Sequence, residues 1–156
     1  NEHVLSLRLP MGDCTLVGEP RLPLVLVAGS TGFAQVKAFV EHAIAQRWQV
    51  PIAVFWGARR VADLYLRELA EQWPAHAANV RVTFTVSQAD APLPAGVRAG
   101  LVQDAVLDDV ADFTACQVYA CGSPAMVYAL QDALVARGLP AERLFSDVFA
   151  WAPRRA

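Results

Sequence analysis

Four small residues, Gly29-Ser30-Thr31-Gly32, directly follow an apolar run that begins at Leu24, and a helical pattern starts after them. Glycines let backbone N–H groups approach the oxygen atoms of a ligand, and the start of a helix adds partial positive charge. The stretch is therefore typical of a turn that holds the phosphates of a nucleotide. By itself the signal is weak, because an ordinary turn between a strand and a helix can have the same composition.

A second group with chemical potential is the pair Cys121-Gly122, which ends another apolar run. The chain has three cysteines in 156 residues, which argues against a disulfide framework and favours a reducing cytoplasm. The spacing of Cys116 and Cys121 is not that of a usual zinc pair, and no histidine stands nearby. We therefore expect no metal site.

The elements that must position these residues alternate along the chain. Residues 22–29, 50–57, 80–87, 116–122 and 143–150 read as strands, whereas residues 34–47, 61–73, 99–110 and 124–138 read as helices, the second of them ended by Pro74. This order predicts an α/β fold with a doubly wound, mainly parallel five-stranded sheet and helices on both faces. Ligands bind such sheets outside the carboxyl ends of the strands, so Gly29, Gly57, Ser87 and Cys121 should share one edge.

Composition excludes several classes of protein. Hydrophobic residues make up 55% of the chain and the net charge is -2, which fits a buried sheet and gives no reason to expect nucleic acid. The apolar runs are too short for a membrane span, and residues 1–20 lack the basic start and continuous apolar segment of a signal peptide.

Two families of nicotinamide enzymes use a turn of this kind. Short-chain dehydrogenases place a further glycine soon after it and need a Tyr-x-x-x-Lys pair for proton transfer. Lys37 is the only lysine in this chain, and no tyrosine precedes it. The catalytic pair cannot be built, so the chemistry excludes this family.

The ferredoxin–NADP reductase-like family of flavin reductases is the other. "LVLVAGSTGFAQ" resembles its first strand and Gly-rich turn, "VFWGARRVADLYL" its second strand and Leu-Tyr helix, "VYACGSPAMVYAL" its Cys-Gly-x-Pro-x-Met element, and "FSDVFAWAP" its aromatic C-terminal segment. The resemblance covers residues 22–153 in the right order. Within the family, the sequences of the second and third of these segments are most similar to those of reductases that serve hydroxylases or deoxysugar-forming systems.

The resemblance implies the following roles. Gly29, Ser30, Thr31 and Gly32 would hold the pyrophosphate, and Cys121 would lie against the nicotinamide ring, shaping the stack without acting as a nucleophile. The other residues expected at the cofactors are Gly57, Arg59, Arg60, Ser87, Gln88, Gly122, Ser123, Pro124, Met126, Phe149 and Trp151, with Asp147 as a second catalytic candidate beside the flavin. Met126 and the two aromatic residues could equally be core, a buried small apolar side chain is the alternative for Cys121, and Arg60 could be a solvated charge.

Two positions depart from the usual pattern of the turn. Ser30 stands where glycine is common and would need a backbone conformation open to a β-carbon, or a modest strain. Gln35 stands where proline is common, and its amide could donate to a phosphate instead.

Cofactor choice should depend on the segment after the third strand. NADPH-specific relatives carry a Ser-Arg pair there, whereas this chain has Ser87 and Gln88, followed by Asp90. A carboxylate opposes a 2′-phosphate and suits a ribose diol, so NADH is favoured over NADPH. Arg59 or Arg60 could reverse that preference, since guanidinium groups suit phosphates.

We expect two parts of unequal length. Residues 1–21 read as a β-hairpin, the C-terminal remnant of a flavin-binding β-barrel domain, and residues 22–156 as the NAD(P)H-binding domain. The barrel's Arg-x-Tyr-Ser flavin motif is absent, so FAD or FMN would bind a domain upstream of residue 1, and this chain alone should be inactive. The full enzyme would pass hydride from NAD(P)H to the flavin and electrons to a ferredoxin or iron–sulfur partner. The alternative is a nucleotide-binding or electron-transfer module without redox chemistry of its own.

Overall fold

The computed structural model describes residue 6 and residues 14–16, 18–89 and 92–154. Most of the hairpin expected in residues 1–21 lies outside these ranges, as does Asp90, so both stay predictions.

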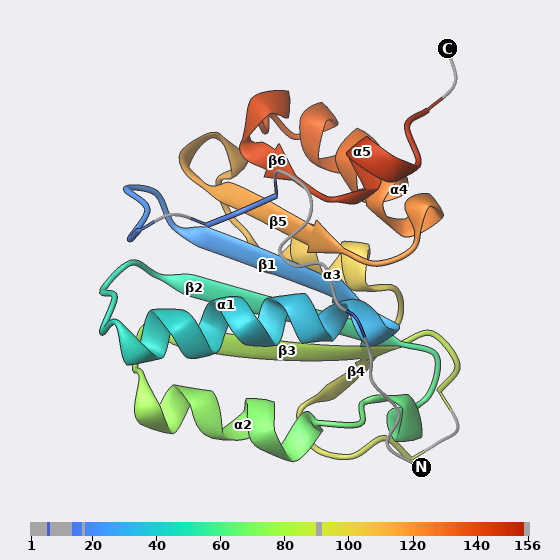
Figure 1. Cartoon of the computed structure of the whole chain (residues 1–156). Coiled ribbons are helices and arrows are strands. Elements are labelled where there is room, and N and C mark those ends of the chain that lie inside the picture. Colours follow the sequence, from blue (N-terminus) through green and yellow to red (C-terminus); the bar gives the residue numbers. More distant parts are fainter. Residues whose placement is uncertain (1–5, 7–13, 17, 90–91, 155–156) are drawn as a thin grey trace.

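A single parallel sheet forms the centre of the molecule (Figure 1). Its strands are β1 (Leu24–Gly29), β2 (Ile52–Ala58), β3 (Val80–Val86), β4 (Val97–Ala99), β5 (Gln117–Cys121) and β6 (Leu144–Phe145). The six strands lie in the order β4-β3-β2-β1-β5-β6, and each neighbouring pair is parallel. The expected doubly wound sheet is confirmed, with one strand more than the sequence predicted. The chain runs from β1 outward in one direction and later returns to β5 on the other side, so the order reverses between β1 and β5.

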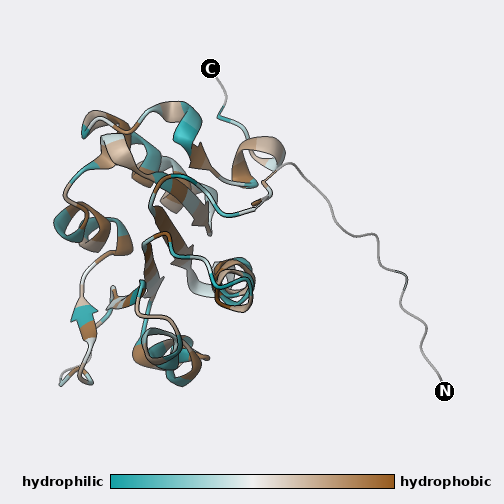
Figure 2. Cartoon of the chain, turned by 90° about the vertical axis from the view of Figure 1, so that its left-hand side faces the viewer, coloured by the Kyte–Doolittle hydropathy of each residue, from teal (hydrophilic) through white to brown (hydrophobic). Residues whose placement is uncertain are grey.

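Helices cover both faces of the sheet (Figure 1). They are α1 (Phe33–Ala45), α2 (Arg67–His76), α3 (Val102–Asp109), α4 (Pro124–Ala136) and the single turn α5 (Val148–Trp151). Alternate residues of β1 enter separate cores: Leu24 and Leu26 pack with α1 and α2, whereas Val25 and Val27 pack with α3 and α4. Apolar strands therefore lie between amphipathic helices (Figure 2). Within the described ranges, no helix is long and apolar enough to cross a membrane.

Three expected elements differ in the structure. The strand expected over 143–150 is only β6, because the Ser146 hydroxyl accepts a hydrogen bond from the Val148 amide at 3.3 Å, and such local bonds favour a turn. Residues 61–63 form a separate 3₁₀ turn before α2, and Pro74 lies inside the last turn of α2 instead of ending it. The helix expected from residue 99 begins at Val102, because residues 97–99 pair with β3.

Stacked aromatic rings support the turn after β1. Phe33 stacks on Trp56 with ring centroids 3.7 Å apart and planes 6° from parallel, and Trp73 packs at 5.6 Å from Phe33. The indole Nε1 of Trp56 donates to the Ser30 carbonyl oxygen at 3.0 Å. The fully buried Phe33 and Trp56 therefore join the first turn of α1 to β2 and hold the backbone of the turn in place.

Replacing Phe33 by alanine should lower the free energy of unfolding by about 3–5 kcal/mol, since a buried ring is lost and a cavity remains. The matched control is Tyr65→Ala, which removes a ring that packs edge-on against Phe33 and Trp56 but is 50% exposed. Its loss should be about 1 kcal/mol. Urea unfolding measures the free energy of unfolding of both variants. An equal decrease in the two would contradict the conclusion that Phe33 supports the turn.

Candidate functional site

The turn after β1 has an unusual backbone at Ser30. Residues 30–32 form one 3₁₀ turn between β1 and α1. Ser30 has a φ of +48°, the left-handed region that glycine adopts most readily. The expectation of modest strain at Ser30 is therefore met, and the Trp56 hydrogen bond to its carbonyl helps to hold that conformation.

The same turn lies directly against the end of β5. A β-carbon on Gly32 would overlap the carbonyl group of Cys121 and would lie 3.0 Å from the amide nitrogen of Gly122. A β-carbon on Gly29 would meet the sulfur of Met126 at 2.5 Å. Gly32 is thus required by contact with backbone, whereas a larger residue at Gly29 would displace the flexible side chain of Met126, which lies on α4 against the turn.

Two adjoining pockets follow the carboxyl edge of the sheet. One has a volume of about 510 Å³ and is lined by Gly29, Ser30, Thr31, Gly32, Ala34, Gln35, Cys121, Gly122, Ser123, Pro124, Asp147 and Trp151. The other has a volume of about 320 Å³ and is lined by Gly29, Ser30, Gly57, Ala58, Arg59, Thr85, Ser87, Gly100, Leu101, Val102, Gln103, Ser123 and Met126. We call them the cysteine pocket and the threonine pocket. They share Gly29, Ser30 and Ser123, so together they form a groove across the strand ends, centred on the reversal of strand order.

Cys121 contributes a neutral thiol to the cysteine pocket. Burial raises the pKa of Cys121 to about 12, and negative charge on Cys14 and Asp147 acts in the same direction. The side chain is 2% exposed. A thiol that stays protonated at physiological pH is a poor nucleophile, which agrees with the expected role as a packing surface.

Asp147 is held at the mouth of the cysteine pocket by a residue distant in the sequence. The Gln35 amide Nε2 donates to Asp147 Oδ2 at 3.1 Å, joining α1 to the start of α5 across 112 positions of sequence. Trp151, 63% exposed, stands at the rim of the same pocket. The sequence analysis considered Gln35 only as a phosphate donor and did not expect this contact.

Backbone hydrogen bonds join the segments that follow β2 and β3. The amide of Ser87 donates to the carbonyl of Ala58 at 3.0 Å, and that of Gln88 donates to the carbonyl of Arg59 at 2.8 Å. These bonds place the two segments expected to select the cofactor side by side. Ser87 lies one residue beyond the end of β3, at the expected edge.

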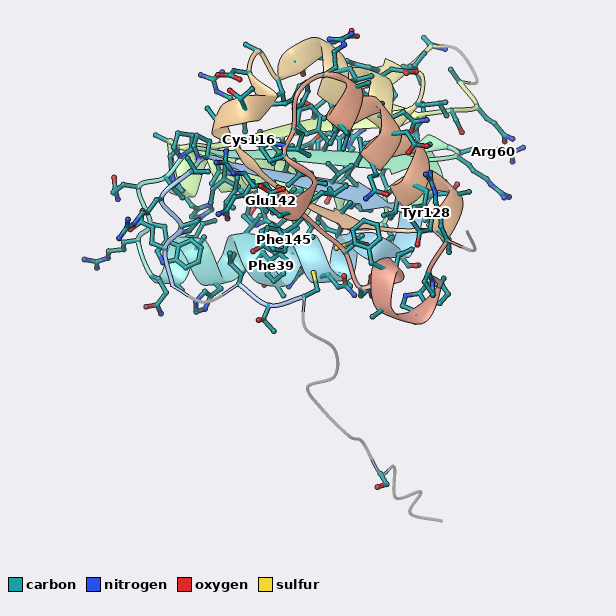
Figure 3. The ribbon with its side chains drawn as sticks, turned by 90° about the horizontal axis from the view of Figure 1, so that it is seen from above. Phe39, Arg60, Cys116, Tyr128, Glu142 and Phe145 are labelled. Atoms are coloured by element: carbon teal, nitrogen blue, oxygen red, sulfur yellow. The ribbon has the colours of Figure 1, made fainter. Side chains whose placement is uncertain are left out.

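Three expected site residues lie outside the linings of both pockets. Arg60 begins the 3₁₀ turn at 61–63, where its amide donates to Asp63 at 3.0 Å, and its side chain extends from the end of the sheet opposite Cys116 (Figure 3). Gln88 is exposed beside the threonine pocket. Phe149 is partly buried, and its ring lies 5.6 Å from that of Tyr128, packed against the core that α4 helps to form. The other expected residues line the groove, and their binding roles remain predictions.

The sequence analysis missed part of the threonine pocket. Thr85 and the residues from Gly100 to Gln103 line it, but none was expected there. Thr85 sits within an alternating strand pattern, and the start of α3 was placed at residue 99. With the start of α3 placed at Val102, the residues from Gly100 to Gln103 would have been expected at the edge of the sheet.

A comparison with known proteins identifies the family to which this chain belongs. Residues 26–132 match the family model of the oxidoreductase NAD-binding domain. The chain belongs to this family. The groove described above thus lies in a nicotinamide-nucleotide-binding fold.

Relatives in sequence and solved structures agree with this family assignment. The chain is 34% identical over 148 residues to CDP-6-deoxy-L-threo-D-glycero-4-hexulose-3-dehydrase reductase of Yersinia pestis, covering 95% of this chain and 44% of the relative. It is 33% identical over 149 residues to terephthalate 1,2-dioxygenase reductase component 2 of Comamonas sp, covering 96% and 44%. The crystal structure of the Amycolatopsis cytochrome P450 reductase GcoB superposes with a TM-score of 0.80 and 29% identity, over 88% of this chain and 41% of that one. This chain therefore spans less than half the length of each.

The Cys121 thiol should make the unfolding free energy depend on pH in the alkaline range. The unfolded thiol loses its proton near its ordinary value of 9, whereas the folded pKa is about 12. The folded state therefore binds more protons between these values, and its stability falls as pH rises. The Cys121 contribution should fall by about 1.4 kcal/mol per pH unit.

Urea unfolding at several values between about pH 9 and 10.5, compared between the wild type and Cys121→Ala, isolates this contribution. The wild type should lose its stability advantage over the variant as pH rises. Parallel pH profiles for the two proteins would contradict a neutral, buried Cys121.

Enlarging Gly32 should move the turn away from the end of β5. We expect Gly32→Val to weaken NADH binding at least about tenfold, because the backbone N–H groups of the turn lose their positions. Ala38→Val, an exposed change on α1, is the control. Calorimetry gives the two dissociation constants, and unchanged affinity in a folded Gly32→Val protein would contradict the role of the turn.

Proposed function

We propose that this chain is the NAD(P)H-binding domain of a flavin-dependent oxidoreductase, which transfers hydride from NAD(P)H to FAD or FMN and passes electrons to an acceptor. The observation that carries the proposal is the continuous groove over the strand ends, with the glycine turn at its centre. An extended dinucleotide fits such a groove at the point where the strand order reverses.

The turn and the two pockets each hold a different part of the nucleotide. Backbone N–H groups from Gly29 to Gly32, with the Thr31 hydroxyl, hold the pyrophosphate, and the start of α1 adds favourable charge. The nicotinamide lies in the cysteine pocket, where the neutral, buried Cys121 and Gly122 offer a flat surface without competing nucleophilic chemistry. The adenosine lies in the threonine pocket, near Arg59 and Ser87.

The flavin belongs to a domain that precedes this one. When bound, it accepts the hydride and releases electrons singly or in pairs. Residues 1–21 are the remnant of that domain and residues 22–156 the nucleotide-binding domain. The exposed Trp151 and the Asp147–Gln35 pair at the rim of the cysteine pocket lie where the flavin and nicotinamide rings must meet, so they border the flavin.

Two relatives indicate the class of electron acceptor. A dehydrase reductase and a dioxygenase reductase component are both similar to this chain over nearly its whole length. We infer that the complete protein serves an oxygenase or dehydrase system through a ferredoxin or iron–sulfur partner. The three free thiols, Cys14, Cys116 and Cys121, fit a reducing cytoplasm.

Binding of NADH and NADPH to this chain tests the proposal. The wild type should bind NADH about tenfold more tightly than NADPH, because Gln88 offers no charge and Asp90 opposes the 2′-phosphate by on the order of 1–2 kcal/mol. Gln88→Arg should shrink or invert this preference, since a guanidinium grips a phosphate with two parallel hydrogen bonds. Calorimetry with both nucleotides measures the ratio.

Gln46→Arg provides the control, since it adds the same charge at an exposed site after α1. It should leave the ratio unchanged. A wild-type preference for NADPH would show that Arg59 or Arg60 already supplies the phosphate site. A folded chain that binds neither nucleotide would overturn the proposed function.

A further inference from the structure

The Thr85 hydroxyl is an unsatisfied polar group in the interior of the protein. Thr85 is 1% exposed, and its Oγ1 is the one buried side-chain polar atom in the described ranges that lacks a hydrogen-bond partner. Leaving a buried hydroxyl unpaired costs about 1–3 kcal/mol, whereas valine would fill the same space without that cost. A buried hydroxyl without a partner in the protein therefore indicates that a bound ligand supplies the partner.

The position of this hydroxyl points to the nucleotide groove. Thr85 lies opposite Gly57 in the pairing of β3 with β2, and both residues line the threonine pocket. A β-carbon on Gly57 would lie 3.2 Å from Thr85 Oγ1 and 2.7 Å from the β-carbon of Val102. The hydroxyl thus faces the space above Gly57, beside the first residue of α3.

The surroundings favour an oxygen-rich ligand. The N-terminus of α3 has no side-chain cap, so the N–H groups of its first two residues, Val102 and Gln103, are available to an acceptor. The next one, that of Asp104, donates to the Leu101 carbonyl at 3.2 Å. Arg59, Ser87 and Gln103 supply further donors around the same pocket. Ribose and phosphate oxygens are acceptors that match these donors, whereas the nicotinamide end of the groove lies on the other side of the turn.

We propose that Thr85 is a nucleotide-binding residue whose hydroxyl donates a hydrogen bond to a ribose or phosphate oxygen in the adenosine half of NAD(P)H. The inference rests on the proposed function and adds a residue to it. The hydroxyl oxygen has less than 1 Å² of accessible surface, so the contact forms when the residues around it, Val102 at the start of α3 among them, shift as the nucleotide enters.

Thr85→Val tests the hydrogen bond with almost no change of shape. The dissociation constant of NADH, measured by calorimetry on this chain, should rise about 3–10-fold, the range that corresponds to one net hydrogen bond. Thr85→Ser keeps the hydroxyl and should stay within about twofold of the wild type. Thr83→Val is the matched control, since Thr83 lies two residues earlier on the same strand face, outside the pocket linings, and its hydroxyl contacts Asp109 at 3.4 Å.

Two fragments of the cofactor locate the contact. ADP-ribose should lose affinity for Thr85→Val by the same factor as NADH, whereas reduced nicotinamide mononucleotide should bind both proteins equally. An equal loss for the mononucleotide would overturn the assignment to the adenosine half.

Thermal unfolding without ligand separates binding from structure. Thr85→Val should melt at the wild-type temperature or a few degrees above it, because the orphan hydroxyl is removed. A lower melting temperature would mean that the hydroxyl has a partner within the protein and would overturn the inference. If the wild type binds NADH and Thr85→Val binds it equally well, the inference alone fails, whereas a folded wild type that binds no NADH overturns the proposed function as well.

Discussion

The backbone of the turn after β1 touches the backbone at the end of β5, and the rest of the site is arranged around that contact. Gly32 has no room for a side chain because the Cys121 carbonyl occupies the position of a β-carbon. The approach brings the glycine turn and the start of α1 next to Cys121. The surfaces proposed to hold the phosphates and the nicotinamide ring are thereby joined within one groove, which a looser packing of β1 against β5 would separate.

That contact needs a rigid support, which comes from the opposite side of β1. Phe33 and Trp56 stack beneath the turn, and the indole N–H of Trp56 holds the Ser30 carbonyl. A serine at positive φ costs free energy that a glycine would not. The hydrogen bond and the buried rings offset that cost, so the turn keeps its shape although its second residue departs from the common pattern.

The strand order decides which loops form each side of the groove. Because β1 lies between β2 and β5, the loops after β2 and β3 form one side of the turn, and the loop after β5 forms the other. Paired backbone bonds from Ser87 to Ala58 and from Gln88 to Arg59 carry the sheet-like pairing into the loops. The side proposed to contact adenosine therefore keeps backbone pairing beyond the strands, whereas the side proposed to contact the nicotinamide depends on the packing of Cys121 and on the hydrogen bond between Gln35 and Asp147.

The sequence by itself determined the fold class and the edge of the sheet at which the groove lies. Period-two and helical patterns are local, and the alternation of strands and helices leaves few topologies, so β1, β2, β3 and β5 were predicted within a few residues. Glycines at the strand ends then marked the turn. Short elements were predicted less well: β4 was missed, because three residues are too few for a period to show, and β6 has two residues where a strand over 143–150 was expected.

Only the tertiary structure decided which side chains meet in the groove. The contact of Gln35 with Asp147 joins positions 112 residues apart, and Thr85 reaches the groove because β3 places it opposite Gly57, beneath the first turn of α3. Phe149 packs beside Tyr128 against the core because α5 replaces the predicted strand, and its expected contact with the flavin stays a prediction. Such contacts depend on the packing of elements distant in the chain, which a pattern read along one segment does not contain.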